Sequence, residues 1–267
     1  MSLKQNIKSN KMDKSSIKKI AEIRKKLNRK KIVTSAWMQL SNSNLTELMC
    51  LAKFDCITFD FEHGLFSVKD LPDLFRVLEQ NKKLPLIRLP NKNVEIAAQC
   101  LDAGSGGLII PNIQNSEELK KIIEKSHLPP EGKRGVGFSR SNRFGKNFNY
   151  YIKNKIKPLI IAMIESKLAV KNIDSILKTK GLDAILIGPY DLSASYNIVG
   201  KFKNPLFKNS LKKIKNTCRK YKVACGMHVI EPTIKNLNYH KKQGFKFLPY
   251  GIDTDILNRA IKKLFKN

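Results

Sequence analysis

Charged and imidazole side chains stand at the ends of four short apolar runs in the sequence. The runs end in FDFEHG at 59–64, IRLP at 87–90, IES at 164–166 and IGPYDLS at 187–193. A charge beside a buried apolar segment costs free energy unless it is paired or binds a metal ion. If the runs are strands of one barrel, their carboxyl ends converge and these side chains form one site. The residues concerned are Asp60, Glu62, His63, Arg88, Glu165 and Asp191.

These residue types favour metal-assisted chemistry at an oxygen atom. Glu165 and Asp191 are two carboxylates from successive runs, which suits Mg²⁺ or Mn²⁺ with the other positions left to water and substrate. His63 is a candidate general base near neutral pH. Arg88 is a candidate for stabilising negative charge that develops on an oxygen.

Two other kinds of site are disfavoured. Histidine and cysteine do not cluster in the sequence, which argues against a structural zinc site. An imine mechanism needs a lysine that projects from a barrel strand into an apolar site. Despite 42 lysines, none falls inside the second to seventh apolar runs.

The elements that must position this site alternate regularly after residue 31. Eight apolar runs are each followed by an amphipathic stretch of helical length, which predicts an α/β protein with a (β/α)₈ TIM barrel. No glycine-rich phosphate-binding motif follows any run, so a nucleotide fold has no support. The predicted strands are 32–38, 56–61, 85–89, 107–111, 159–164, 184–188, 224–228 and 246–250, and the predicted helices are 44–52, 68–80, 94–102, 116–125, 167–178, 206–221, 233–243 and 254–265.

The N-terminal segment precedes this alternation. Residues 1–14 are polar and lysine-rich and predict a flexible arm, so that 15–267 form a single barrel domain. Between Ser15 and Asn28, isoleucine and leucine recur at helical spacing, which predicts a helix that caps the barrel. A mitochondrial presequence is the alternative, although such segments are usually richer in arginine.

The longest connection, 112–157, follows the fourth run. We expect it to include a loop at the mouth of the barrel, where long loops usually have a function. Its arginines Arg134, Arg140 and Arg143 either shape the far end of the substrate site or only fasten the loop.

The net charge of +29 raises the question of nucleic-acid binding. Lysine outnumbers arginine by 42 to 9 and is spread along the chain, whereas arginine is the better ligand for phosphates and bases. We therefore interpret most of the charge as compositional bias, with a basic RNA-binding protein as an alternative. The five cysteines form no CxxC pair and no apolar run could span a membrane, which predicts a cytoplasmic enzyme with reduced thiols.

Taken in order, the motifs resemble those of the HpcH/HpaI aldolases, metal-dependent (class II) pyruvate aldolases on a (β/α)₈ barrel. The resemblance extends from about Ser15 to Phe265. Besides the four runs above, it includes PLIRLP at 85–90, LDAGSGGLIIPNIQN at 101–115, PPEGKRGVG at 129–137 and GIDT at 251–254.

The resemblance implies a carbon–carbon lyase that cleaves a 4-hydroxy-2-oxo acid reversibly to pyruvate and an aldehyde. Sugar-derived acids are among the candidate substrates, and the enolate would be stabilised by Mg²⁺, Mn²⁺ or Co²⁺. It also implies a homo-oligomer, in which dimers exchange the helix 254–265 and assemble into hexamers. Neither a membrane nor a nucleic acid is expected as a partner. The alternative on the same scaffold is a citryl- or malyl-CoA-type lyase.

Individual roles follow from the same resemblance. It implies metal binding by Glu165 and Asp191, catalysis by His63 and Arg88, and an aspartate, Asp102, that raises the basicity of His63. The resemblance also implies that Asp60 contacts His63. It further implies that the pyruvate carboxylate is bound by the turn formed by Gly188, Pro189, Tyr190 and Asp191. Met163 and Tyr190 stand where the family often has glutamine and a small residue, so the identity of the substrate stays open.

Overall fold

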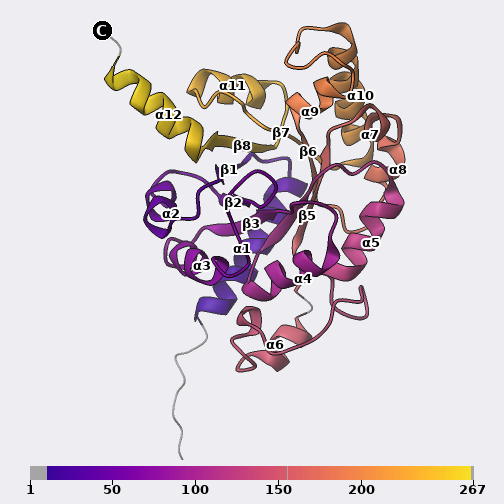
Figure 1. Cartoon of the computed structure of the whole chain (residues 1–267). Coiled ribbons are helices and arrows are strands. Elements are labelled where there is room, and N and C mark those ends of the chain that lie inside the picture. Colours follow the sequence, from indigo (N-terminus) through magenta and orange to yellow (C-terminus); the bar gives the residue numbers. More distant parts are fainter. Residues whose placement is uncertain (1–10, 155, 266–267) are drawn as a thin grey trace, which may run out of the picture.

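The chain folds into a closed barrel of eight parallel strands in sequence order (Figure 1). This computed structural model describes residues 11–154 and 156–265. The predicted TIM barrel is therefore confirmed, with strand bounds that differ from the prediction by at most two residues. The strands are β1 (Val33–Met38), β2 (Cys56–Asp60), β3 (Leu84–Arg88), β4 (Gly107–Ile110), β5 (Leu159–Ile164), β6 (Ala184–Ile187), β7 (Ala224–Met227) and β8 (Phe247–Ile252).

Alternate side chains of each strand point into the barrel lumen and toward the surrounding helices, as strand geometry requires. In β3, Leu84 and Leu86 belong to the lumen core, whereas Ile87 packs in the layer between strands and helices. The next lumen position in β3 is Arg88, at the carboxyl end of the strand. This period of two is what directs functional side chains into the mouth of the barrel.

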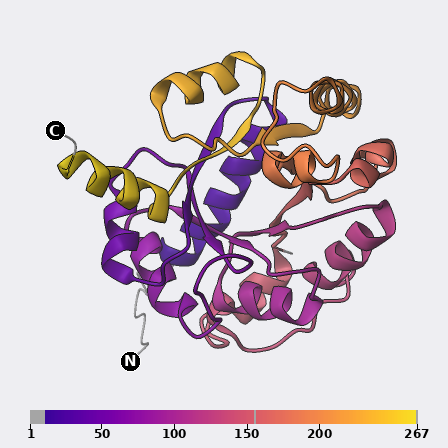
Figure 2. The same cartoon turned by 45° about the horizontal axis from the view of Figure 1, so that its top comes forward.

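The helices surround the barrel (Figure 2). The predicted helix 167–178 is divided into α7 and α8 at Asn172, whose side-chain amide donates a hydrogen bond to the Gln114 carbonyl (2.9 Å). The IGPYDLS segment forms a short helix, α9, that was not predicted. The helices after β1 are α2 (Ser43–Cys50), α3 (Leu71–Gln80), α4 (Val94–Ala103), α5 (Ser116–Ser126), α6 (Phe148–Lys153), α7 (Lys167–Lys171), α8 (Ile173–Leu177), α9 (Pro189–Ala194), α10 (Pro205–Tyr221), α11 (Ile234–Lys242) and α12 (Asp253–Leu264).

The helix α1 (Lys11–Asn28) closes the amino-terminal end of the barrel, which confirms the predicted cap. Its buried residues Ile20, Ile23 and Leu27 belong to the lumen core. The predicted arm 1–14 is too long, because the helix already begins at Lys11. Residues 1–10 of that arm lie outside the described residues.

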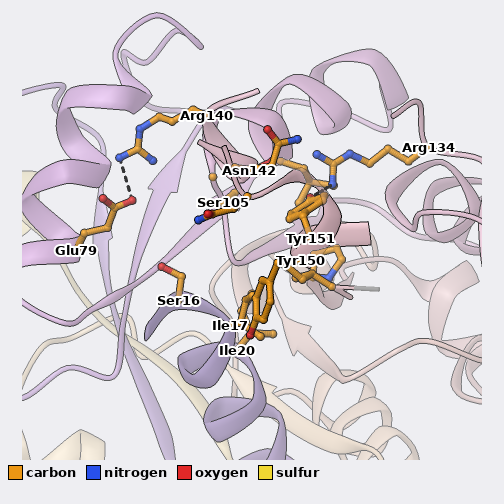
Figure 3. A pocket seen from close by; sticks show the side chains of 16 residues that line it. Ser16, Ile17, Ile20, Glu79, Ser105, Arg134, Arg140, Asn142, Tyr150 and Tyr151 are labelled. Atoms are coloured by element: carbon orange, nitrogen blue, oxygen red, sulfur yellow. Dashed lines mark hydrogen bonds and ion pairs between the residues drawn. The ribbon is translucent and has the colours of Figure 1, made fainter. Parts of the chain in front are cut away.

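The segment that follows α5, which is the longer part of the connection after β4, lies at the opposite end of the barrel from the one we predicted. Helix α5 runs back from the mouth, so the segment between α5 and β5 lies at the amino-terminal end, beside α1 (Figure 3). There Arg134 donates to Asp102 (2.5 Å) and to the Tyr151 hydroxyl (3.1 Å). Arg140 donates to the Ala103 carbonyl (3.0 Å) and pairs with Glu79 (2.9 Å). These two arginines fasten the loop and do not shape the mouth.

The structure also bears on the predicted reduced thiols and on the expected absence of a membrane span. The five cysteines are all unpaired and buried. Among the described residues, no helix combines the length and the apolar character needed to cross a membrane.

Candidate active site

A cavity of about 260 Å³ opens at the carboxyl ends of the strands. Most of the predicted site residues line this cavity, although they come from distant parts of the sequence. Its walls are formed by Trp37, Gln39, Asp60, His63, Arg88, Met163, Gly188, Pro189, Tyr190, Asp191, His228, Ile230 and Ile252.

A buried ion pair between Asp60 and Arg88 forms one wall. The two residues are partners in the β2–β3 register. Arg88 donates from Nε to Asp60 Oδ1 (2.7 Å) and from Nη2 to Oδ2 (2.5 Å), and its Nη1 pairs with Glu62 (2.8 Å). Burial alone would raise the pKa of Asp60, but the hydrogen bonds and charge of Arg88 lower it below the usual value. Asp60 therefore stays ionised and fixes the plane of the guanidinium.

The same carboxylate shapes the turn that carries His63. Oδ1 of Asp60 accepts hydrogen bonds from the backbone N–H groups of Glu62 (3.0 Å) and His63 (3.2 Å). The predicted contact between Asp60 and His63 is therefore made to the backbone amide. The His63 side chain lies at the cavity, on the exposed side of the mouth.

The carboxylates of Glu165 and Asp191 converge on Gly188. A Cβ atom on Gly188 would lie 2.8 Å from Oε1 of Glu165 and 3.4 Å from Oδ2 of Asp191. The other oxygen of Glu165 accepts a hydrogen bond from the Asn112 N–H (2.7 Å). A side chain at position 188 would collide with Glu165, so this close approach of backbone and carboxylate requires glycine.

The electrostatics of this carboxylate pair fit a divalent cation. Burial raises the pKa of Glu165 to about 7; the Asn112 N–H opposes this rise, and the charges of Asp191 and Glu62 add to it. Negative charges that repel one another at a buried site are what a cation would relieve. No group of three His, Cys, Asp or Glu side chains among the described residues could chelate a metal. The chain would thus supply two carboxylates, as is common for Mg²⁺.

Glu165 lies behind the lining residue Gly188, whereas Asp102 lies far from the cavity within a single chain. It lies near the end of α4, the helix that runs from the end of β3 back toward the start of β4. Its carboxylate is paired with Arg134 at the other end of the barrel. Within one chain, Asp102 therefore cannot set the basicity of His63.

Several residues of the cavity were missed by the analysis of motifs. Trp37 is the fifth residue of β1, and its indole Nε1 donates to Asp60 (3.0 Å). His228 directly follows β7. Both occupy lumen positions at strand ends, so the rule that located Arg88 would also have located them. They were overlooked because no acidic motif stands beside them.

A closed parallel barrel with paired carboxylates, an arginine and a histidine at its mouth is typical of an enzyme. Comparison with known protein families narrows the class of enzyme. Residues 34–260 match the model of the family described as HpcH/HpaI aldolase/citrate lyase. The chain belongs to this family, which confirms the resemblance, the fold and the carbon–carbon lyase class inferred from the sequence.

Individual relatives agree with this assignment. The chain is 30% identical over 236 residues to the 5-keto-4-deoxy-D-glucarate aldolase of Escherichia coli O6:H1 strain CFT073, covering 88% of this chain and 91% of that protein. The crystal structure of an HpcH/HpaI aldolase from Desulfitobacterium hafniense DCB-2 superposes with a TM-score of 0.82 and 27% identity, covering 90% and 93% of the two chains. A citrate lyase beta subunit from M. tuberculosis, complexed with oxaloacetate and magnesium, shares the fold (TM-score 0.57, 11% identity, 91% and 100% covered).

Proposed function

We propose that this protein is a metal-dependent aldolase that cleaves a 4-hydroxy-2-oxo acid reversibly to pyruvate and an aldehyde. The observation that carries the proposal is the convergence of Glu165 and Asp191 on Gly188, in the cavity that also holds Arg88. The relative named 5-keto-4-deoxy-D-glucarate aldolase supports a sugar-derived acid as the substrate class.

Glu165 and Asp191 would hold the divalent cation. A bound divalent cation acts as a Lewis acid toward the oxygens of a 2-oxo acid, and so stabilises negative charge on the 2-oxo oxygen. Mg²⁺ or Mn²⁺ suits two carboxylate ligands, and Co²⁺ is a further candidate. The magnesium complex of the citrate lyase beta subunit supports Mg²⁺.

The other side chains divide the remaining work. His63 takes the proton from the C4 hydroxyl when the C3–C4 bond breaks and the aldehyde leaves. Arg88, held in plane by Asp60 and Glu62, donates to the oxygen on which negative charge develops. The first-turn N–H groups of Tyr190 and Asp191 bind the carboxylate of the substrate, and Met163 lines the cavity beside it.

The direct test is exchange of the pyruvate methyl protons in heavy water, followed by NMR. This measurement reports enolate formation without any knowledge of the aldehyde. We expect exchange with Mg²⁺, Mn²⁺ or Co²⁺ and none after chelation. Glu165→Gln should reduce the exchange rate by about 100-fold or more, because a neutral amide is a poor ligand for a hard cation.

A matched control is Glu95→Gln, which makes the same change at an exposed glutamate of α4. It should exchange at the wild-type rate. Metal-independent exchange, or full exchange by Glu165→Gln, would contradict the metal assignment. If wild-type protein exchanges no protons with any of the metals, pyruvate is not the donor, and acyl-CoA thioesters then test the citryl- or malyl-CoA lyase alternative.

We also propose that the working form is a homo-oligomer, a hexamer assembled from dimers that exchange α12. This helix extends away from the barrel (Figure 1), and of its residues only Asp253, at the first position, is buried. It exposes Leu257, Ile261 and Leu264, and Phe265 directly after it is 82% exposed. A row of large apolar side chains in water supports burial against another copy of the chain.

Finally, we infer that the protein works in the cytoplasm. All five cysteines are unpaired and buried, which is usual for proteins of a reducing compartment.

A further inference from the structure

His228 occupies a lumen position at the mouth of the barrel. In β7, Ala224 belongs to the lumen core, whereas Cys225 and Met227 pack under the helices. The alternation therefore directs His228 into the lumen. Its backbone N–H donates to the Ile187 carbonyl (3.3 Å), which places it beside Gly188, the glycine between the two proposed metal ligands.

The imidazole of His228 has no polar partner in the described part of the chain. Its Nε2 is enclosed and forms no hydrogen bond. The ring packs against Trp37 with a centroid distance of 4.7 Å. The nearby polar groups are already engaged, because the indole of Trp37 and the guanidinium of Arg88 both donate to Asp60. Enclosed polar atoms without partners are rare in native proteins and call for an explanation.

Two other histidines also have an unpartnered ring nitrogen, but they lie elsewhere. His127 follows α5 at the amino-terminal end of the barrel, and His240 lies on α11 against Phe245. Neither lines the cavity at the mouth. His228 differs from them because a molecule in that cavity would meet its ring.

The chemical state of the ring limits what that molecule can offer. Burial and the neighbouring Arg88 lower the pKa of His228 to about 4, while Asp60 opposes this shift, so the ring is neutral at pH 7. A neutral imidazole has one N–H donor and one acceptor nitrogen. A hydroxyl group, which both donates and accepts, matches it, whereas an alkyl group would leave the ring nitrogen unpaired.

We propose that His228 is a specificity-determining residue whose imidazole hydrogen bonds to a hydroxyl group of the substrate. The inference rests on the proposed aldolase function and narrows its substrates to hydroxylated 2-oxo acids. The hydroxyl belongs either to the 2-oxo acid that forms the enolate or to the aldehyde half.

The test compares substrates that differ by one hydroxyl group, in the wild type and in His228→Leu. The donors are pyruvate and 3-hydroxypyruvate, and the acceptors are acetaldehyde and glycolaldehyde. In the wild type, we expect kcat/KM to favour the hydroxylated member of one pair by about 10-fold or more. His228→Leu should lose this preference, and the pair that loses it identifies the half that carries the hydroxyl.

His228→Asn retains a donor and an acceptor and should recover part of the preference. His240→Leu makes the same change at an unpartnered histidine outside the cavity and should keep the wild-type ratios. Unchanged ratios for both pairs in His228→Leu would overturn the proposal.

Two readouts separate this proposal from the aldolase proposal. The circular dichroism spectrum of His228→Leu shows whether the variant folds, and metal-dependent exchange of the pyruvate methyl protons by the wild type tests enolate formation. If the wild type shows no exchange, the aldolase proposal fails. The ring resonances of ¹⁵N-labelled His228 then still decide the hydroxyl contact, because they should shift with 3-hydroxypyruvate or glycolaldehyde and not with pyruvate or acetaldehyde. Equal responses within both pairs would refute it.

Discussion

Asp60 organises the site through six hydrogen-bond donors at one carboxylate. Two come from Arg88, one from the indole of Trp37, one from the side-chain amide of Gln39 and two from the backbone of the turn that carries His63. Asp60 is fully buried, so water cannot replace any of these bonds. It is therefore a positioning residue, which couples the direction of the guanidinium to the direction of the turn.

A pH-dependent stability is expected from His228. Its pKa is about 4 in the folded protein, because of burial and Arg88 and despite Asp60, and about 6.5 in an unfolded chain. Between these values the unfolded chain binds the proton more tightly, so the stabilising effect of the neutral ring is complete above pH 6.5 and decreases as the pH falls toward 4. Between pH 6.5 and 4, the free energy of unfolding should fall by at most about 3 kcal/mol more for the wild type than for His228→Leu.

Urea denaturation at pH 7, 5.5 and 4.5 measures this difference. The comparison with His228→Leu is necessary because burial also lowers the pKa values of His127 and His240, and these contribute equally to both proteins. If the free energy of unfolding changes equally with pH in the wild type and the variant, folding does not lower the pKa of His228.

At the scale of residues, the sequence could predict those functional groups that carry a charge beside a strand. Arg88, Glu165 and Asp191 could be predicted because a charge after an apolar run needs a partner. Asp102 could not be placed from its motif, because LDAG says nothing about which end of the barrel the helix end reaches. Gly188 was predicted as part of a turn, but its closeness to Glu165 depends on the pairing of β5 and β6.

Among the elements, α1 is connected to the barrel by the side chain of Arg24. Arg24 donates to both carboxylate oxygens of Asp183 (2.6 and 3.2 Å) and to the Pro158 carbonyl (2.9 Å). Asp183 also accepts from the Ile160 N–H (2.9 Å), at the start of β5. The helix is thereby fixed to the base of two neighbouring strands.

Arg24→Ala should lower the free energy of unfolding by about 1.5–3 kcal/mol, the usual range for hydrogen bonds to charged groups. Arg29→Ala removes an exposed arginine next to the same helix and should change stability by less than about 0.5 kcal/mol. Chemical denaturation of both variants measures the difference. Equal stabilities would mean that the apolar residues of α1 hold it without Arg24.

The alternation of apolar runs and amphipathic stretches sufficed to predict the order and type of these elements. The position of the segment between α5 and β5 also follows from this alternation, because a helix between parallel strands runs back to the amino-terminal end of the barrel; the length and the arginines of the segment led to the wrong expectation. The break between α7 and α8 escaped prediction. At the break, Asn172 donates a hydrogen bond to the carbonyl of Gln114, a residue far away in the sequence.

For the whole molecule, the testable property is its assembly through α12. Ile261→Asp together with Leu264→Asp places charges on the apolar face of the helix and should reduce the mass measured by light scattering to that of a smaller assembly. Each chain carries a net charge of +29, so copies repel one another, and we expect the wild-type assembly to strengthen with added salt.

The control for this prediction is Lys262→Asp together with Lys263→Asp, which adds two carboxylates to the opposite side of α12. This variant should keep the wild-type mass. A monomeric wild type, or an Ile261→Asp/Leu264→Asp protein with unchanged mass, would show that the exposed apolar side chains of α12 do not mediate assembly.

The cap formed by α1 determines from which end of the barrel small molecules can enter and leave. With Ile20, Ile23 and Leu27 packed into the lumen core, the described part of the chain closes the amino-terminal end of the barrel, and the cavity opens at the mouth. In the proposed reaction, the aldehyde and the 2-oxo acid would therefore both leave through the mouth. If the residues proposed to hold the 2-oxo acid retain it, the aldehyde leaves first, and product release follows a fixed order.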